Sequence, residues 1–103
     1  MKMQFMGNPA DLFSMQLFHI IETKNLDEIK QAIQMGANPN FQTYEYPNIT
    51  VLMVASFKGW FDVVKLLLEL GADKEIKNAD KKTALDYAKD FNHKKLVRLL
   101  KKT

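Results

Sequence analysis

Segments of this chain repeat one another at a nearly constant interval. IKQAIQMGANPN, at residues 29–40, matches VKLLLELGADKE, at residues 64–75, with an offset of 35 residues. TVLMVASFKG, at residues 50–59, matches TALDYAKDFN, at residues 83–92, with an offset of 33 residues. Intervals of this size are typical of proteins built from stacked units, because one unit alone cannot bury its apolar face. The interval therefore excludes most folds that a short chain could adopt.

Each repeat predicts two short helices separated by a break. Thr50 and Thr83 precede apolar helical runs, where a side-chain hydroxyl can accept a hydrogen bond from a backbone N–H group. Gly36 and Gly71 follow such runs, where the end of a helix favours a left-handed residue. The segment NPAD, at residues 8–11, predicts the start of the first helix, with Asn as its cap and Pro in its first turn.

The second helix of each repeat indicates its place in the stack. Residues 63–70 are almost entirely apolar, whereas residues 26–34 and 94–102 carry apolar side chains on one stripe only. A helix that is apolar nearly all round is buried on several sides. We therefore expect the middle repeat to be covered on both sides and the outer repeats to be caps.

The order Thr-x-Leu-x-x-Ala, short break, apolar helix and Gly-Ala-Asp resembles the ankyrin repeat, most closely at residues 50–73. The resemblance covers roughly nine-tenths of the chain and implies an all-α fold, an ankyrin-repeat solenoid of three helix-turn-helix repeats with β-turn fingers. We expect a single domain over residues 1–103. The predicted repeats are repeat 1 at about 9–40, repeat 2 at about 48–75 and repeat 3 at about 81–103.

The chain departs from the family pattern at several positions. The usual Thr-Pro-Leu-His is TVLM at residues 50–53 and TALD at residues 83–86, so both Pro and both His are absent. The first finger is two residues longer than the second, because the offset falls from 35 to 33. The extra pair lies within NFQTYEYPN, at residues 40–48, so we expect its aromatic side chains to project from the stack. Asn48 and Lys81 replace a glycine, and since Lys adopts the left-handed region less readily, the second finger is expected to bend differently.

The fingers and first helices of ankyrin-like proteins line a concave face that binds other proteins. The resemblance therefore implies a small protein–protein interaction module with one protein partner, for instance an inhibitor or an immunity-type protein. An opposing interpretation is that the aromatic side chains fold back onto their own repeat and stiffen it. The candidate partner-binding residues are Phe41, Tyr44, Tyr46, Phe57, Trp60, Lys77, Lys81 and Lys82.

The charge of the chain suggests two alternatives. Residues 1–73 carry a net charge of −3 (5 Lys, 8 acidic residues), and residues 74–103 carry +6 (10 Lys and Arg, 4 acidic residues). A Lys-rich C-terminal helix could bind nucleic acid or an anionic membrane. A solvated capping face is the simpler explanation, and the single Arg of the helix disfavours base reading, so we expect nucleic acid not to be the partner. The basic residues are Lys94, Lys95, Arg98, Lys101 and Lys102.

A further alternative, independent of charge, is self-association through an imperfect cap that uses Met3, Phe5 and Met6.

The inventory for catalysis is poor. The chain has no Cys, so it lacks a thiolate nucleophile, a thiolate metal site and a disulfide. His19 is expected to be a packing or boundary residue, and His93 is expected to be exposed. The two do not stand at metal-ligand spacing, and there is no glycine-rich phosphate loop. We therefore expect no enzyme, no cofactor and no metal. The start of the chain lacks the apolar run of a signal peptide, and no apolar run reaches the length of a membrane span, so we expect a cytoplasmic, monomeric protein.

Overall fold

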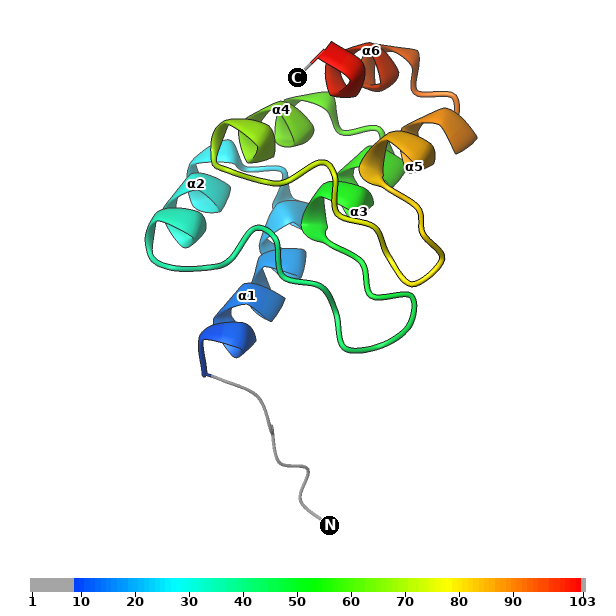
Figure 1. Cartoon of the computed structure of the whole chain (residues 1–103). Coiled ribbons are helices and arrows are strands. Elements are labelled where there is room, and N and C mark those ends of the chain that lie inside the picture. Colours follow the sequence, from blue (N-terminus) through cyan, green and yellow to red (C-terminus); the bar gives the residue numbers. More distant parts are fainter. Residues whose placement is uncertain (1–8, 103) are drawn as a thin grey trace.

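The computed structural model describes residues 9–102, which form helices and loops with no strand among them. The helices stack in pairs, with α1, α3 and α5 in one layer and α2, α4 and α6 in the other (Figure 1). The loops between successive pairs project from the same side of the stack. No helix in this part of the chain is long and apolar enough to cross a membrane. The elements are α1 (Pro9–Ile20), the 3-10 turn η1 (Ile21–Thr23), α2 (Leu26–Gln34), α3 (Val51–Lys58), α4 (Phe61–Glu69), α5 (Ala84–Asp90) and α6 (Lys94–Lys102).

The two predicted threonine caps are confirmed. The Thr50 hydroxyl accepts a hydrogen bond from the backbone N–H of Met53 at 3.2 Å, at the start of α3. The Thr83 hydroxyl accepts from the backbone N–H of Asp86 at 3.3 Å, at the start of α5. The Asp86 carboxylate in turn accepts from the backbone N–H of Thr83 at 3.0 Å, which forms a capping box. The position where the family often has a histidine therefore stabilises its own helix start.

The ends of α2 and α4 have the same geometry. Gly36 and Gly71 adopt φ angles of +115° and +101°, which confirms the predicted positive-φ glycines. The backbone N–H groups that follow them, on Ala37 and Ala72, donate back into the helix at 3.0 and 2.9 Å. These bonds satisfy carbonyl groups that the helix end would otherwise leave unpaired. The predicted cap at Asn8 lies outside the described residues.

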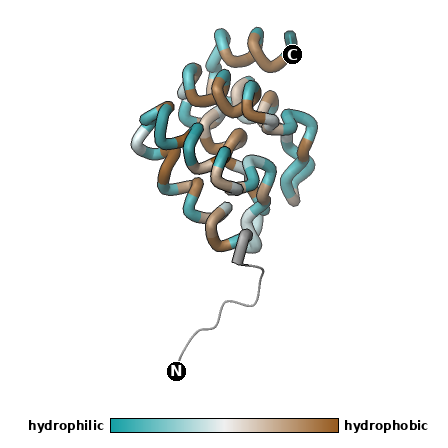
Figure 2. The backbone as a smooth tube through the Cα atoms, turned by 90° about the vertical axis from the view of Figure 1, so that its left-hand side faces the viewer, coloured by the Kyte–Doolittle hydropathy of each residue, from teal (hydrophilic) through white to brown (hydrophobic). Residues whose placement is uncertain are grey.

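The middle repeat forms the centre of the core. Helix α4 contacts both α2 and α6, and α3 contacts α5, which confirms that the middle repeat is covered on both sides. Apolar and polar residues alternate along the helices (Figure 2), so each helix buries one face and exposes the other. The fully buried large side chains include Leu17, Ile21, Ile29, Leu52, Met53, Leu67, Leu96 and Leu100.

Finger one is the loop between α2 and α3, and finger two is the loop between α4 and α5. Hydrogen bonds hold these two fingers side by side. The side chain of Asn40, at the base of finger one, accepts from the backbone N–H of Asp73 at 2.7 Å and donates to the carbonyl of Gly71 at 3.2 Å. Nearer the tips, the backbone N–H of Ala79 donates to the carbonyl of Pro47 at 2.8 Å. The fingers are therefore tied together at the base and near the tip, which limits their independent motion.

The residues that replace the family's glycine share one φ angle in both fingers. Asn48 and Lys81 each adopt a φ angle of +64°, so the lysine takes the left-handed conformation as the asparagine does. In each finger the backbone N–H of this residue closes a tight turn, to Glu45 at 2.8 Å and to Asn78 at 2.9 Å. The turn imposes the left-handed conformation on Lys81 despite its side chain. Asn48 gains in addition a bond from its side-chain amide to the carbonyl of Thr43 at 2.8 Å.

Candidate functional site

We call the side of the stack formed by the fingers and by α1, α3 and α5 the inner face. The structure divides the predicted binding residues between two places on this face. One group lies on the fingers and the other at the ends of the first helices, next to the break between the helices of a repeat. The finger group consists of Tyr44, Tyr46, Lys77, Lys81 and Lys82, and the helix-end group consists of Phe57 and Trp60.

Phe41 belongs to neither group, because its side chain is only 8% exposed. Its ring meets that of Tyr44 edge to face, with the ring centroids 5.5 Å apart. Its backbone N–H donates to the carbonyl of Asn38 at 3.2 Å, a turn at the start of the finger. Because burying an aromatic ring is favourable, this side chain is buried within the protein, which corrects the expectation that it projects.

The two finger tyrosines are exposed and yet held in place. Tyr44 is 56% and Tyr46 is 71% exposed. The hydroxyl of Tyr44 donates to the Asp11 carboxylate of α1 at 2.7 Å, and the hydroxyl of Tyr46 donates to the Asp80 carboxylate of finger two. Because the carboxylate in each pair accepts this hydrogen bond, it favours the protonated hydroxyl. The pKa of each tyrosine is therefore raised above its ordinary value. The fixed hydroxyls orient two rings that are both more than half exposed.

A polar hollow of about 420 Å³ lies between the two fingers and is open to solvent. The Gln42 amide spans it, donating to the carbonyl of Asn48 and to the carbonyl of Lys77, both at 3.0 Å. Its other lining residues include Tyr44 and Asn78. The lining contains no carboxylate, and none of the described residues form a group of three or more side chains that could hold a metal ion. The hollow can therefore accept polar groups of a partner.

The buried Asn78 side chain organises finger two. Its carbonyl oxygen accepts from the backbone N–H groups of Asp80 and Lys82, both at 2.9 Å. Its amide donates to the hydroxyl of Tyr87, on α5, at 2.7 Å. One asparagine thus fixes both the bend of the finger and its attachment to the helix layer. Sequence reasoning missed this residue, although its place after a helical repeat and before Thr83 marks it as a turn residue.

The lysines of finger two differ in their surroundings. Lys82 forms an ion pair with Asp90 at the end of α5, with 2.5 Å between the ammonium and the carboxylate. Hydrogen bonding to the Asp90 carboxylate raises the pKa of Lys82. Lys77 and Lys81 are exposed and have no such ion pair within the described part of the chain. Two of the three predicted lysines therefore present uncompensated charge near the exposed tyrosines.

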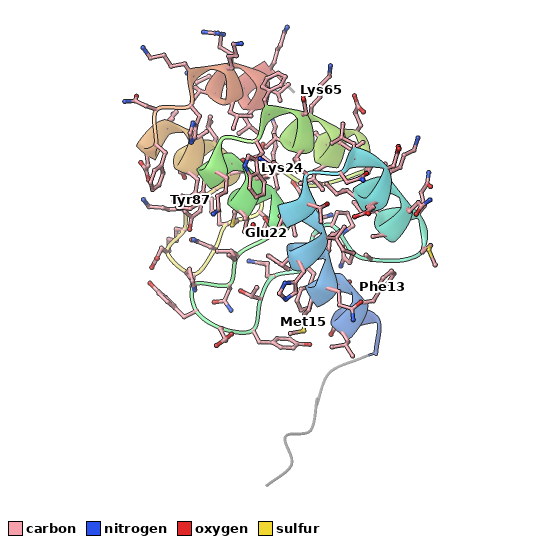
Figure 3. The ribbon with its side chains drawn as sticks, turned by 180° about the vertical axis from the view of Figure 1, so that it is seen from behind. Phe13, Met15, Glu22, Lys24, Lys65 and Tyr87 are labelled. Carbon is pink, nitrogen blue, oxygen red and sulfur yellow. The ribbon has the colours of Figure 1, made fainter. Side chains whose placement is uncertain are left out.

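Aromatic and basic side chains meet at the other end of the inner face. The rings of Phe57 and Phe91, which are 40% and 49% exposed, pack edge to face with 4.5 Å between centroids. Trp60 is partly buried, and the ammonium groups of Lys24 and Lys58 lie 5.4 and 5.8 Å from its ring centroid, in cation–π range. Figure 3 shows Lys24 at the end of the first helical segment, facing the middle repeat.

Lys24 is a component of this cluster that sequence reasoning missed. It follows η1 with a φ angle of +55°, and its backbone N–H donates to the carbonyl of Ile21 at 3.0 Å. The first repeat matches the family pattern poorly before residue 25, so its position could not be mapped from the repeat. Its charge places a second cation beside Trp60.

The predicted exposure of His93 and the predicted packing of His19 are both wrong. His93, expected to be exposed, is partly buried, and its Nε2 lies 2.9 Å from the carbonyl oxygen of Phe57 in the preceding repeat. Since a carbonyl only accepts, Nε2 carries the proton and donates. His19, expected to be a packing or boundary residue, is exposed on α1, so it does not pack among apolar neighbours. The chain thus has an inter-repeat histidine bond, at a position outside the usual Thr-Pro-Leu-His motif.

The stacked helix pairs and their paired loops define an all-α repeat protein. The family model described as ankyrin repeats (3 copies) matches residues 17–103, and the chain belongs to the ankyrin repeat family. Ankyrin repeats indicate a protein–protein interaction module, and the family is in general not enzymatic.

Similar segments occur within much longer proteins. A serine/threonine-protein kinase, VIK, of Arabidopsis thaliana is 46% identical over 57 residues, which are 55% of this chain and 13% of the kinase. The potassium channel GORK of the same plant is 36% identical over 74 residues, 72% of this chain and 9% of the channel. The human ARF GTPase-activating protein GIT2 is 36% identical over 87 residues, 84% of this chain and 11% of that protein. The chain therefore spans only about a tenth of the length of these curated relatives, so their activities are not assigned to it.

Proposed function

We propose that this chain binds one partner protein through the fingers and the inner helix ends, and that it acts by occluding or tethering that partner. An inhibitor or immunity-type protein is the simplest form of this activity. In this proposal Tyr44 and Tyr46 are the anchors, Lys77 and Lys81 attract acidic groups, and Phe57 and Trp60 extend the contact. The absence of cysteine fits a cytoplasmic setting, and a monomer leaves the inner face open.

The exposed but oriented tyrosines carry the proposal. Tyrosine is enriched among the residues that contribute most to protein interfaces. Ordering a mobile side chain on binding costs about 0.5–1.5 kcal/mol, and the bonds to Asp11 and Asp80 meet part of that cost in the free protein. Tyr44 also lines a polar hollow together with Lys77, which has no ion pair within the described part of the chain. Aromatic surface, polar groups and positive charge are therefore close together on the fingers.

The test is affinity capture from the extract of cells that express the protein, followed by binding measurements with the purified partner. The variant is Tyr44→Ala/Tyr46→Ala, checked for an unchanged fold by circular dichroism. The control is Met35→Ala, because Met35 is an exposed apolar residue, at 76%, that follows α2 in the other layer. We expect the affinity to fall by about a hundredfold in the tyrosine variant and to be unchanged in the control.

Retention of the same partner at the same affinity by the tyrosine variant would contradict the finger proposal. A second double variant, Tyr44→Phe/Tyr46→Phe, keeps both rings and removes the hydroxyls that orient them. We expect a smaller loss, about tenfold, because the rings remain but must be ordered on binding. If the phenylalanine variant loses as much affinity as the alanine variant, the hydroxyl groups themselves contact the partner.

The alternative is charge-driven binding of nucleic acid or an anionic membrane through α6. Such binding weakens steeply as salt rises, whereas aromatic anchoring persists. The exposed basic residues of α6 favour this alternative, but Arg98 is its single arginine, and no exposed large apolar side chain lies on this helix. A salt titration of the captured complex distinguishes the two functions.

A further inference from the structure

A groove with an apolar floor runs along the layer opposite the inner face. Its first part, a hollow of about 610 Å³, lies over α6 beside the start of α4. A second hollow of about 500 Å³ lies beside the end of α4, and Leu99 lines both. The two hollows therefore adjoin at Leu99, and we name them together the groove between α4 and α6. Each has the size that protein pockets for ligands or side chains usually have.

The first hollow combines apolar and basic side chains. Phe61 and Leu99 form its floor and are partly buried against the core. Lys95, Arg98, Lys101 and Lys102 line its rim and are exposed. No carboxylate lines this hollow, and none of the four cations has an ion pair within the described part of the chain. The hollow therefore has a field of one sign around an apolar centre, which favours an anionic occupant.

The second hollow has a different charge pattern. Glu69, Asp73 and Glu75 line it together with Lys65 and Lys74. Figure 3 shows Lys65 extending outward from α4 below α6, with nitrogen-tipped side chains gathered around α6. The groove thus changes from purely basic to mixed charge along its length. An occupant with carboxylates at one end only would fit one orientation better than the reverse.

The shape of the groove distinguishes between anionic partners. A protein that inserts into a membrane surface needs protruding apolar side chains, and no exposed large apolar residue belongs to the described parts of α4 and α6. Nucleic-acid binding favours exposed aromatic rings for stacking, and the aromatic residue here, Phe61, is recessed. A hollow with a recessed apolar floor instead accepts an apolar side chain that protrudes from the partner.

We infer that the groove between α4 and α6 binds an acidic peptide segment, whose large apolar side chain rests on Phe61 and Leu99 between carboxylates that meet Lys95, Arg98, Lys101 and Lys102. This second surface lies on the opposite layer from the fingers. The protein would then hold two segments at once, one on each side of the stack. It could therefore bring the partner of the inner face into contact with an acidic protein.

The probe is a fluorescein-labelled peptide in which one Leu is flanked on each side by Glu and Asp residues, measured by fluorescence anisotropy. The test variant is Lys95→Glu/Arg98→Glu, which reverses two charges on the rim. The control is Lys30→Glu/Lys89→Glu, which makes the same change in net charge at exposed residues outside the groove. We expect about a tenfold loss of affinity in the test variant and a change within about threefold in the control.

Changes in the peptide test the apolar floor without altering the protein. Replacing its Leu by Gly is expected to weaken binding about tenfold, and replacing its acidic residues by amides is expected to abolish binding. The Tyr44→Ala/Tyr46→Ala variant should bind the peptide as the unmodified protein does. The finger proposal fails if this variant still binds the inner-face partner, and the groove proposal fails if the unmodified protein does not bind the peptide. The two failures are therefore distinguishable.

Several outcomes would overturn the inference. An equal loss in the test and control variants would show only nonspecific attraction between opposite charges. Equal binding of the Leu and Gly peptides would show that the floor is not used. Tighter binding of vesicles rich in phosphatidylserine, or of a single-stranded oligonucleotide, with the same sensitivity to the test variant would assign the groove to a membrane or a nucleic acid instead. A failure to bind the peptide at low salt would exclude an acidic segment as the occupant.

Discussion

Gly59 is the residue at which a single added methyl group should disturb the contact between two repeats. It ends α3 with a φ angle of +78°, in the left-handed region. A Cβ atom built on it would lie 2.6 Å from Cε1, 2.7 Å from Nδ1 and 3.0 Å from Nε2 of His93. The distances of 2.6 and 2.7 Å are too short for a Cβ atom, which forms no hydrogen bond, so the imidazole ring would have to move. Its hydrogen bond to the carbonyl of Phe57 would move with it.

The expected cost of Gly59→Ala has two parts. The left-handed conformation costs a residue with a Cβ atom about 1 kcal/mol. Displacing the His93 ring adds about 2 kcal/mol, from the lost hydrogen bond and the strained packing. The free energy of unfolding should therefore fall by about 3 kcal/mol, measured by urea denaturation. Gly71→Ala is the matched control, because Gly71 has a φ angle of +101° and no atom within 4 Å of the added Cβ, so we expect it to cost only about 1 kcal/mol.

A double-mutant cycle separates the two parts. In a His93→Ala background the ring is gone, so Gly59→Ala should cost only about 1 kcal/mol, the conformational part. The coupling energy between the two residues is then about 2 kcal/mol. If Gly59→Ala costs the same with and without the imidazole, the ring does not pack against this glycine and the account of the repeat contact is refuted.

Other predictions concern the fingers. Lys81→Gly should raise the free energy of unfolding by about 0.5 kcal/mol, because glycine adopts the φ angle of +64° without strain. Asn48→Gly, at the same φ angle, should lower it by about 1 kcal/mol, because the hydrogen bonds of the amide are lost. Urea denaturation measures both changes, and changes of the same sign would contradict the reasoning. Phe41→Ala should cost about 3 kcal/mol in the same assay and Tyr46→Ala less than about 1 kcal/mol, since one ring is buried and the other exposed. Because the Asp80 carboxylate raises the pKa of Tyr46, the bond stabilises the fold below pH of about 10 and this contribution is lost as pH rises through the folded pKa. In ring-labelled NMR titrations, Asp80→Asn should lower the pKa of Tyr46, and an unchanged value would show that the hydroxyl does not donate to this carboxylate.

Much of the fold followed from short-range signals in the sequence. The caps at Thr50 and Thr83, the positive-φ glycines after α2 and α4, and the burial of the middle repeat depend on residue types within one or two helical turns. The matching φ angles of Asn48 and Lys81 show where intrinsic preference was a poor guide. There the turn hydrogen bond decided the conformation, and a lysine adopted it at some cost.

The orientation of the aromatic side chains on finger one depends on partners far away in the sequence. Phe41 and Tyr44 stand three positions apart in one loop, yet the first is buried and the second exposed. Tyr44 is held by Asp11, 33 positions earlier, and Tyr46 by Asp80, 34 positions later. Loop composition indicates a turn but contains no information about such partners, so the sequence left open whether the rings fold back.

The sequence separations between these hydrogen-bonded residues match the repeat interval. Asn40 bonds Asp73 across 33 positions, and His93 bonds Phe57 across 36. A polar residue that bonds to a neighbouring repeat therefore meets its partner about one interval away, because stacking places equivalent positions side by side. Side chains that lack a partner both at that interval and within their own repeat remain available to other molecules. Among residues 9–102, the side chains of Lys77 and Lys81 meet this condition, and this is the reason that the proposal places the partner on the fingers.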